Sequence, residues 1–124
     1  MDDAKAVRWE KRVWYEIGLF RLALDRPEEA LAAFRKGLSD KDWSNRDWSP
    51  VVDACSRSSE SKDHAYGVQF ALWTLSHSRS VKTMAPFAAV CAEKQGESKL
   101  AAWFLAVGRG VQSFVAPSEA MPAE

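Results

Sequence analysis

Apolar residues in the first part of the chain recur at helical spacing. The members of this stripe are Val13, Ile17, Phe20 and Leu24. Steps of three and four residues bring side chains onto one side of a helix, and an apolar side is normally buried. The pattern therefore predicts a helix over residues 4–24 whose stripe faces the core.

A turn interrupts this pattern at residues 25–27. Pro27 suits the first turn of a following helix, because the N–H that proline lacks is unused there. Glu28 and Glu29 favour the same helix end through the helix dipole. The sequence predicts a second helix from this point to about Leu38.

The rest of the chain alternates between apolar helical segments and short polar breaks. Ser49 followed by Pro50 is a strong helix start, with the serine expected as N-cap. Further helices are expected over residues 50–58, 63–78, 84–94 and 98–114. The last of them has an apolar side made of Leu100, Trp103, Phe104, Val107, Val111 and Phe114. Two large rings, Trp43 and Trp48, lie in the polar connector before the third helix, where they either fold back or await a partner.

Small residues repeat with a period close to the length of two helices. Gly18, Ala54 and Ala89 form one series, and Ala30, Ala65 and Ala101 form a second. Both series have a spacing of about 35 residues, which is typical of helical repeats. The sequence thus predicts three antiparallel helical hairpins in one domain over residues 1–115, followed by a flexible C-terminal tail over 116–124.

The first hairpin resembles a tetratricopeptide repeat. The matching residues are Trp14, Ile17-Gly18, Ala30, Phe34 and Gly37-Leu38. The resemblance implies an all-α protein whose three hairpins stack as a short TPR-like α-solenoid. It also implies that the chain binds another protein, since such repeats commonly act as scaffolds, adaptors or chaperones.

A second helical-repeat family is similar to two shorter segments. Residues 51–57 and 88–96 resemble the first helices of pentatricopeptide repeats, which bind single-stranded RNA one base per repeat. The chain carries 17 basic and 17 acidic residues, so its net charge is zero. Neutrality removes the usual electrostatic attraction for nucleic acid, and we keep RNA binding as the alternative function.

The tetratricopeptide resemblance also implies which side chains face a partner. The expected binding residues are Arg12, Tyr15, Leu19, Leu22, Trp48 and Val51. The same alignment adds Cys55, Pro86, Val90 and Glu93. An apolar groove of this kind suits an amphipathic helix or an extended apolar segment, although these residues could equally form the core. The carboxylate clamp of the family is not expected, because only Arg12 among its places carries a suitable donor.

Composition and the lack of motifs narrow the classes of function that the chain could have. No apolar run approaches the length of about 20 residues that crosses a bilayer, and the acidic start of the chain is unlike an export signal. Cys55 and Cys91 are then expected as buried free thiols in a cytoplasmic protein. No nucleotide, metal or triad motif occurs, so we expect neither an enzyme nor a cofactor. The expected function is a protein-binding adaptor, an escort for an aggregation-prone partner, or a subunit of an assembly.

Overall fold

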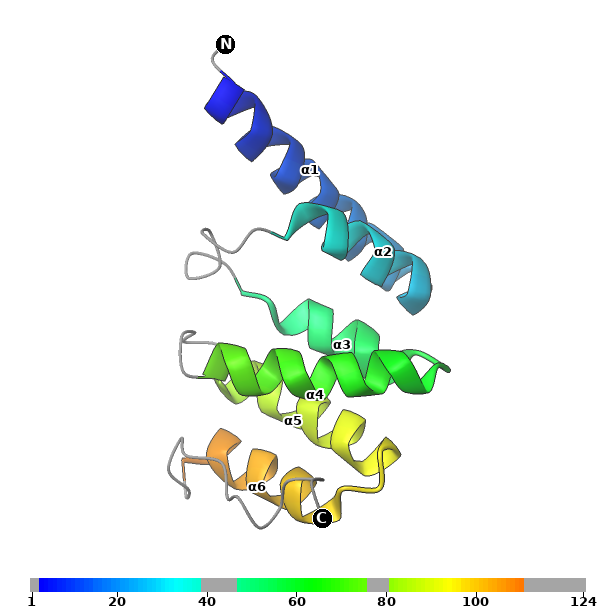
Figure 1. Ribbon diagram of the computed structural model, residues 1–124, viewed down its shortest axis with the longest axis vertical. Coiled ribbons are helices and arrows are strands. Elements are labelled where there is room, and N and C mark those ends of the chain that lie inside the picture. The colour runs from blue at the N-terminus through cyan, green and yellow to red at the C-terminus, as the bar shows by residue number, and fades with distance from the viewer. Residues whose placement is uncertain (1–2, 39–46, 76–80, 111–124) are drawn as a thin grey trace.

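The computed structural model describes residues 3–38, 47–75 and 81–110, and every element within these ranges is an α-helix (Figure 1). The helices are α1 (Asp3–Ala23), α2 (Pro27–Gly37), α3 (Ser49–Arg57), α4 (Ser61–Leu75), α5 (Val81–Lys94) and α6 (Ser98–Gly108). The all-α class expected from the hydrophobic pattern is confirmed.

The helices follow one another along the long axis of the molecule, with α1 at one end and α6 at the other (Figure 1). The most extensive contacts join α1 to α2 and α5 to α6. In the middle, α3 packs against α2, α4 and α5, whereas α1 meets α3 only marginally. The first pair is therefore joined to the rest of the molecule chiefly through α2.

A glycine sets the distance between α1 and α2. A Cβ atom at Gly18 would lie 2.9 Å from Cζ of Phe34, inside van der Waals contact. Ala30 on α2 is fully buried, and Asp25 has a φ of 59° in the turn between the helices. Small residues where the two helices touch allow the Phe34 ring to pack closely against α1 at Gly18.

A second glycine lies where three helices meet. A Cβ at Gly67 of α4 would come within 2.7 Å of both Cβ of Cys55 on α3 and Sγ of Cys91 on α5. Both cysteines are completely buried and are not in a disulfide. This contact joins the middle helices and explains why the residues at the junction are small.

The apolar stripe of α1 corrects one expectation. Val13, Phe20 and Leu24 are 37%, 66% and 50% exposed, so the stripe faces away from the core rather than into it. The buried side of α1 instead contains Gly18 and Leu22. Periodicity identified the helix, but only the position of α2 decides which of its two apolar sides is covered.

The helix ends differ slightly from those expected. Ser49 is the first helical residue rather than the N-cap, and its N–H donates to Oδ1 of Asp47 over 3.0 Å. Helix α5 starts at Val81, before the expected residue 84, and includes Pro86 within it. The expected ends of the fourth and last helices, with Val111 and Phe114, and the tail over 116–124 lie outside the described ranges.

Candidate functional site

An open groove runs between α5 and α6 at the end of the molecule opposite α1. It consists of two adjoining hollows of about 460 Å³ and 290 Å³ that share Pro86 and Leu105. We call it the α5–α6 groove and define it by Pro86, Ala89, Val90, Ala101, Ala102 and Leu105. Val90 and Leu105 are each 43% exposed. Two large aliphatic side chains thus remain in contact with water on one surface, as is typical of a surface that binds another molecule.

Charged side chains are distributed unevenly along this groove. Lys82 and Arg109 line the smaller hollow, and neither forms an ion pair with a residue in the described ranges. Glu93 and Lys94 border the other hollow, where the Lys94 amine donates to the carbonyl of Ser56. One end of the groove therefore carries two available positive charges, and an acidic group of a ligand would be attracted there.

The proline in α5 removes one helical hydrogen bond near this basic end. Proline has no backbone N–H, so Pro86 cannot donate to the carbonyl of Lys82 one helical turn earlier. Both residues line the smaller hollow. The hollow thus combines apolar walls with two cations, and its wall on α5 lacks one hydrogen bond of the helix.

The sequence-predicted binding residues are divided between core and surface. Leu22, Trp48 and Val51 are buried by the chain itself. Leu19 is partly buried against the core, whereas Arg12 is exposed. The three buried side chains offer no free surface in this structure, so any partner that contacts this region meets their neighbours instead.

Tyr15 connects the first helix to the segment before α3. Its hydroxyl donates to the carbonyl of Asp47 over 2.6 Å. Its ring lies 5.7 Å from Phe34 and 5.0 Å edge-on from Trp48, measured between ring centroids. Trp48, one of the two connector rings, has therefore folded back onto the core. Trp43 lies outside the described ranges.

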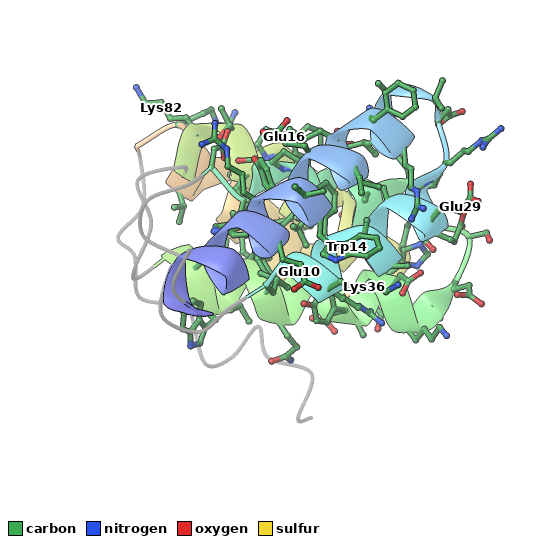
Figure 2. All side chains as sticks on the ribbon, turned by 90° about the horizontal axis from the view of Figure 1, so that it is seen from above. Glu10, Trp14, Glu16, Glu29, Lys36 and Lys82 are labelled. Atoms are coloured by element: carbon green, nitrogen blue, oxygen red, sulfur yellow. The ribbon has the colours of Figure 1, made fainter. Side chains whose placement is uncertain are left out.

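Trp14 packs beneath a cation from α2. The Lys36 amine lies 4.3 Å from the centre of the Trp14 ring, and Figure 2 shows the two side chains next to each other. This contact is a cation–π interaction within the first helix pair. The Trp14 ring is half-buried, and the Lys36 amine lies over one of its faces.

The residues expected to face the groove in the third hairpin are exposed, unlike the buried Leu22, Trp48 and Val51. Pro86, Val90 and Glu93 all line the α5–α6 groove and are exposed. Sequence reasoning missed the opposite wall, which includes Leu105 of α6 and Arg109 directly after that helix. Their only signal was an apolar or basic residue on the side of that helix opposite its buried stripe, a pattern that most surface helices share.

The polar residues around the turn between α3 and α4 include a serine, an aspartate and a histidine. The hydroxyl of Ser58 donates to Oδ2 of Asp63 over 2.6 Å. The His64 ring is bonded through Nε2 to the backbone carbonyl of Ser58, not to its hydroxyl. Ser58 is also 1% exposed. This arrangement closes a helix junction, and it does not pair a hydroxyl with an imidazole base as nucleophilic catalysis requires.

The two thiols lie in an environment that suppresses ionisation. Burial raises the pKa of Cys91 to about 12 and also raises that of Cys55. Because the thiolate is the reactive and metal-binding form, both are poor nucleophiles and ligands at neutral pH. Within the described ranges, no three His, Cys, Asp or Glu side chains gather in a way that could hold a metal ion.

No helix in the described part of the chain has a run of apolar residues long enough to cross a bilayer. Comparison with protein-family models, curated proteins and solved structures finds no significant match. The resemblance to tetratricopeptide repeats therefore stays a prediction that rests on the residues of the first hairpin.

Proposed function

We propose that this chain is a protein-binding module of the tetratricopeptide-like type, acting as an adaptor or chaperone, and that its binding site is the α5–α6 groove. The order of helix contacts supports a stack of three hairpins. Each of the pairs α1–α2, α3–α4 and α5–α6 is in contact, and α3 also packs on α5 across the boundary between two pairs. Such a stack buries its core only between neighbouring pairs.

The observation that carries the proposal is the combination of apolar walls and a basic end in one groove. Val90 and Leu105 present apolar surface from two facing helices. Lys82 and Arg109 stand at one end with no ion pair inside the described ranges. The ligand that matches these features is an amphipathic helix of another protein with acidic residues near one end.

RNA binding has less support from the same residues. Of the two segments that resemble pentatricopeptide repeats, 51–57 is mostly buried, whereas 88–96 has a buried side with Cys91 and an exposed side with Val90 and Glu93. Residues inside the core cannot stack on bases or reach their edges, and the exposed Val90 and Glu93 supply neither an aromatic ring nor a positive charge. A protein partner therefore remains the proposed ligand.

The test uses a labelled amphipathic peptide of about five helical turns, with leucines on one side and two glutamates near its N-terminus. We expect fluorescence anisotropy to show binding to the wild-type chain and at least about tenfold weaker binding to Val90→Glu, because a charge would enter the apolar contact. Ala32→Glu, at an exposed site on α2, is the matched control and should bind normally.

A peptide with lysines in place of the two glutamates checks the basic end of the groove and should bind more weakly. Equal binding of the glutamate peptide to all three proteins, or no binding to any of them, would remove the groove as the site. Co-purification of nucleic acid with the wild-type chain would favour the RNA alternative.

A further inference from the structure

The apolar stripe of α1 lies at one end of the molecule and the α5–α6 groove at the other (Figure 1). We call the stripe the outer face of α1 and define it by Val13, Ile17 and Phe20 on the helix and Leu24 in the turn directly after it. Phe20 is the most exposed large apolar side chain of the described ranges, at 66%. Stacked repeat proteins usually cover both ends with polar surface, and this chain leaves apolar surface at each.

The outer face of α1 has a buried counterpart in α5. The offset that relates Gly18 to Ala89 carries Val13, Ile17 and Phe20 onto Met84, Ala88 and Cys91. The three residues of α5 are at most 1% exposed. Their contacts are with the preceding pair, because Cys91 reaches the carbonyl of Val52 and Met84 accepts a hydrogen bond from Thr74. The same helix side that forms an interface in α5 is thus uncovered in α1.

The α5–α6 groove has an occupied counterpart between α3 and α4. The offset that relates Ala54 to Ala89 carries Cys55 onto Val90 and Gly67 onto Ala102. Cys55 and Gly67 form the place into which the Cys91 side chain of α5 fits. Val90 and Ala102 line the open hollow of about 460 Å³. In the structure, the place between Cys55 and Gly67 is therefore filled by the next helix, whereas the corresponding place between Val90 and Ala102 is open.

We propose that the outer face of α1 from one copy of the chain docks into the α5–α6 groove of a second copy, head to tail. Phe20 of the first copy then lies between Val90 and Ala102 of the second copy, as Cys91 lies between Cys55 and Gly67 within one copy. A phenyl ring needs more room than a thiol, and the open hollow provides it. This inference rests on the proposed function, since it takes the same groove as the binding site and names its partner.

The two surfaces match in length. The outer face of α1 extends from Val13 to Leu24, and the wall of the groove on α5 extends from Lys82 to Glu93. At a rise of 1.5 Å per residue each measures about 16 Å. The outer face of α1 at one end of the molecule therefore has the same length as the α5–α6 groove at the other end.

The charges also match if the docked helix runs parallel to α5. Glu10 and Glu16 project to opposite sides of α1 near the start of its outer face (Figure 2). In the parallel direction this part of α1 meets the basic end of the groove at Lys82 and Arg109. Arg12 also borders this part of the outer face of α1. Its single positive charge is outweighed by the two negative charges of Glu10 and Glu16. The parallel direction is also the one in which α5 follows α3 (Figure 1).

A head-to-tail contact uses two different surfaces, so every added copy exposes a new groove and a new outer face of α1. The wild-type chain should therefore form species larger than a dimer as its concentration rises. A two-fold symmetric dimer would instead use one surface twice and would stop at two copies.

Sedimentation velocity with single variants at each end tests the inference. Phe20→Glu damages the outer face of α1 and Val90→Glu damages the groove, and both sites are exposed, so circular dichroism should show normal folds. Each variant alone should be monomeric. An equimolar mixture should form a one-to-one heterodimer, because each protein retains the surface that the other has lost. Ala32→Glu should assemble like the wild type, and Leu105→Glu should repeat the result of Val90→Glu.

A wild-type chain that stays monomeric at every concentration overturns the inference, and so does a mixture that fails to form the heterodimer. If the acidic peptide still binds the groove in either case, the proposed function survives and only the identity of the partner is wrong. If neither the peptide nor a second copy binds, both proposals fall together.

Discussion

Helices α1 and α5 differ in the number of sides that other helices cover. Helix α5 contacts α3, α4 and α6, whereas α1 has extensive contact only with α2. The outer face of α1 carries the larger residues, yet Phe20 is 66% exposed and its counterpart Cys91 is fully buried. Neighbouring helices, rather than the apolar pattern of the helix itself, decide which sides enter the core.

The sizes of the residues on α1, α4 and α5 also reflect whether another helix covers them. Gly67, Ala88 and Cys91 lie where helices are in contact, and their small size lets the backbones approach. No described helix limits the space in front of Phe20 on the outer face of α1. Large residues at an uncovered end and small residues in the middle are expected if the end is a docking surface.

The largest expected effect is a difference in stability between variants on the two sides of α1. Leu22→Glu places an unpaired charge in the core, since Leu22 is buried, and should cost about 3–5 kcal/mol of the free energy of unfolding. Phe20→Glu, two residues earlier, should change it by less than about 0.5 kcal/mol. Urea unfolding followed by circular dichroism gives both values. Similar losses in the two variants would mean that α1 has no uncovered face.

The junction of the middle helices gives the second test. Gly67→Leu introduces a side chain where even a Cβ would lie 2.7 Å from Cys91 and Cys55, and overpacking of this kind should cost about 2–3 kcal/mol. Gln69→Leu on the same helix is exposed and serves as the control. Thermal melts compare the two. A Gly67 variant as stable as the control would show that α3, α4 and α5 are not packed this closely.

Removal of one hydroxyl tests how the first helix pair is joined to the rest. Tyr15→Phe keeps the ring contacts with Phe34 and Trp48 but loses the hydrogen bond to the carbonyl of Asp47. The expected loss is about 1 kcal/mol of the free energy of unfolding. Amide hydrogen exchange should show the loss most clearly in α1. An unchanged exchange rate there would argue that the hydroxyl bond does not hold this helix.

The smallest effect concerns Glu28, which joins α2 to the turn after α3. Its carboxylate accepts hydrogen bonds from the N–H and the hydroxyl of Ser59, and the N–H bond contributes most to holding its pKa below the ordinary 4.5. A lowered pKa stabilises the fold above pH 4.5, and this contribution disappears as the pH falls through the folded-state value.

Glu28→Gln should therefore lower the stability at pH 7 by less than about 1 kcal/mol, because the group is exposed. The gap between variant and wild type should close below pH 4.5. Melting temperatures measured from pH 3 to pH 7 give this difference. Glu29→Gln, which disrupts only a surface pair with Arg26 at 3.7 Å, should show no comparable trend, and an equal trend in both variants would remove the role assigned to Glu28.

Much of the fold could be predicted from local signals. Apolar spacing, Pro27 and the Ser49-Pro50 pair located helices because each acts within a few residues along the chain. Gly18 and Phe34 were among the residues by which the first hairpin resembles a tetratricopeptide repeat, and the structure places them in contact. The binding residues were harder to predict, because an apolar residue can line a groove or enter the core. Leu22, Trp48 and Val51 are apolar and lie in the core.

The sequence alone determined that the chain is helical, where along the chain its helices lie to within a few residues, and that small residues recur about every 35 positions. Only the tertiary structure decided that the Val13–Leu24 stripe faces outward, that Trp48 folds back onto Tyr15, and that Val90 and Leu105 form the walls of one groove. The physical reason is that helical periodicity is a property of neighbours along the chain. Burial depends on which helices lie alongside in space, and two apolar sides of one helix are equivalent until a neighbour covers one of them.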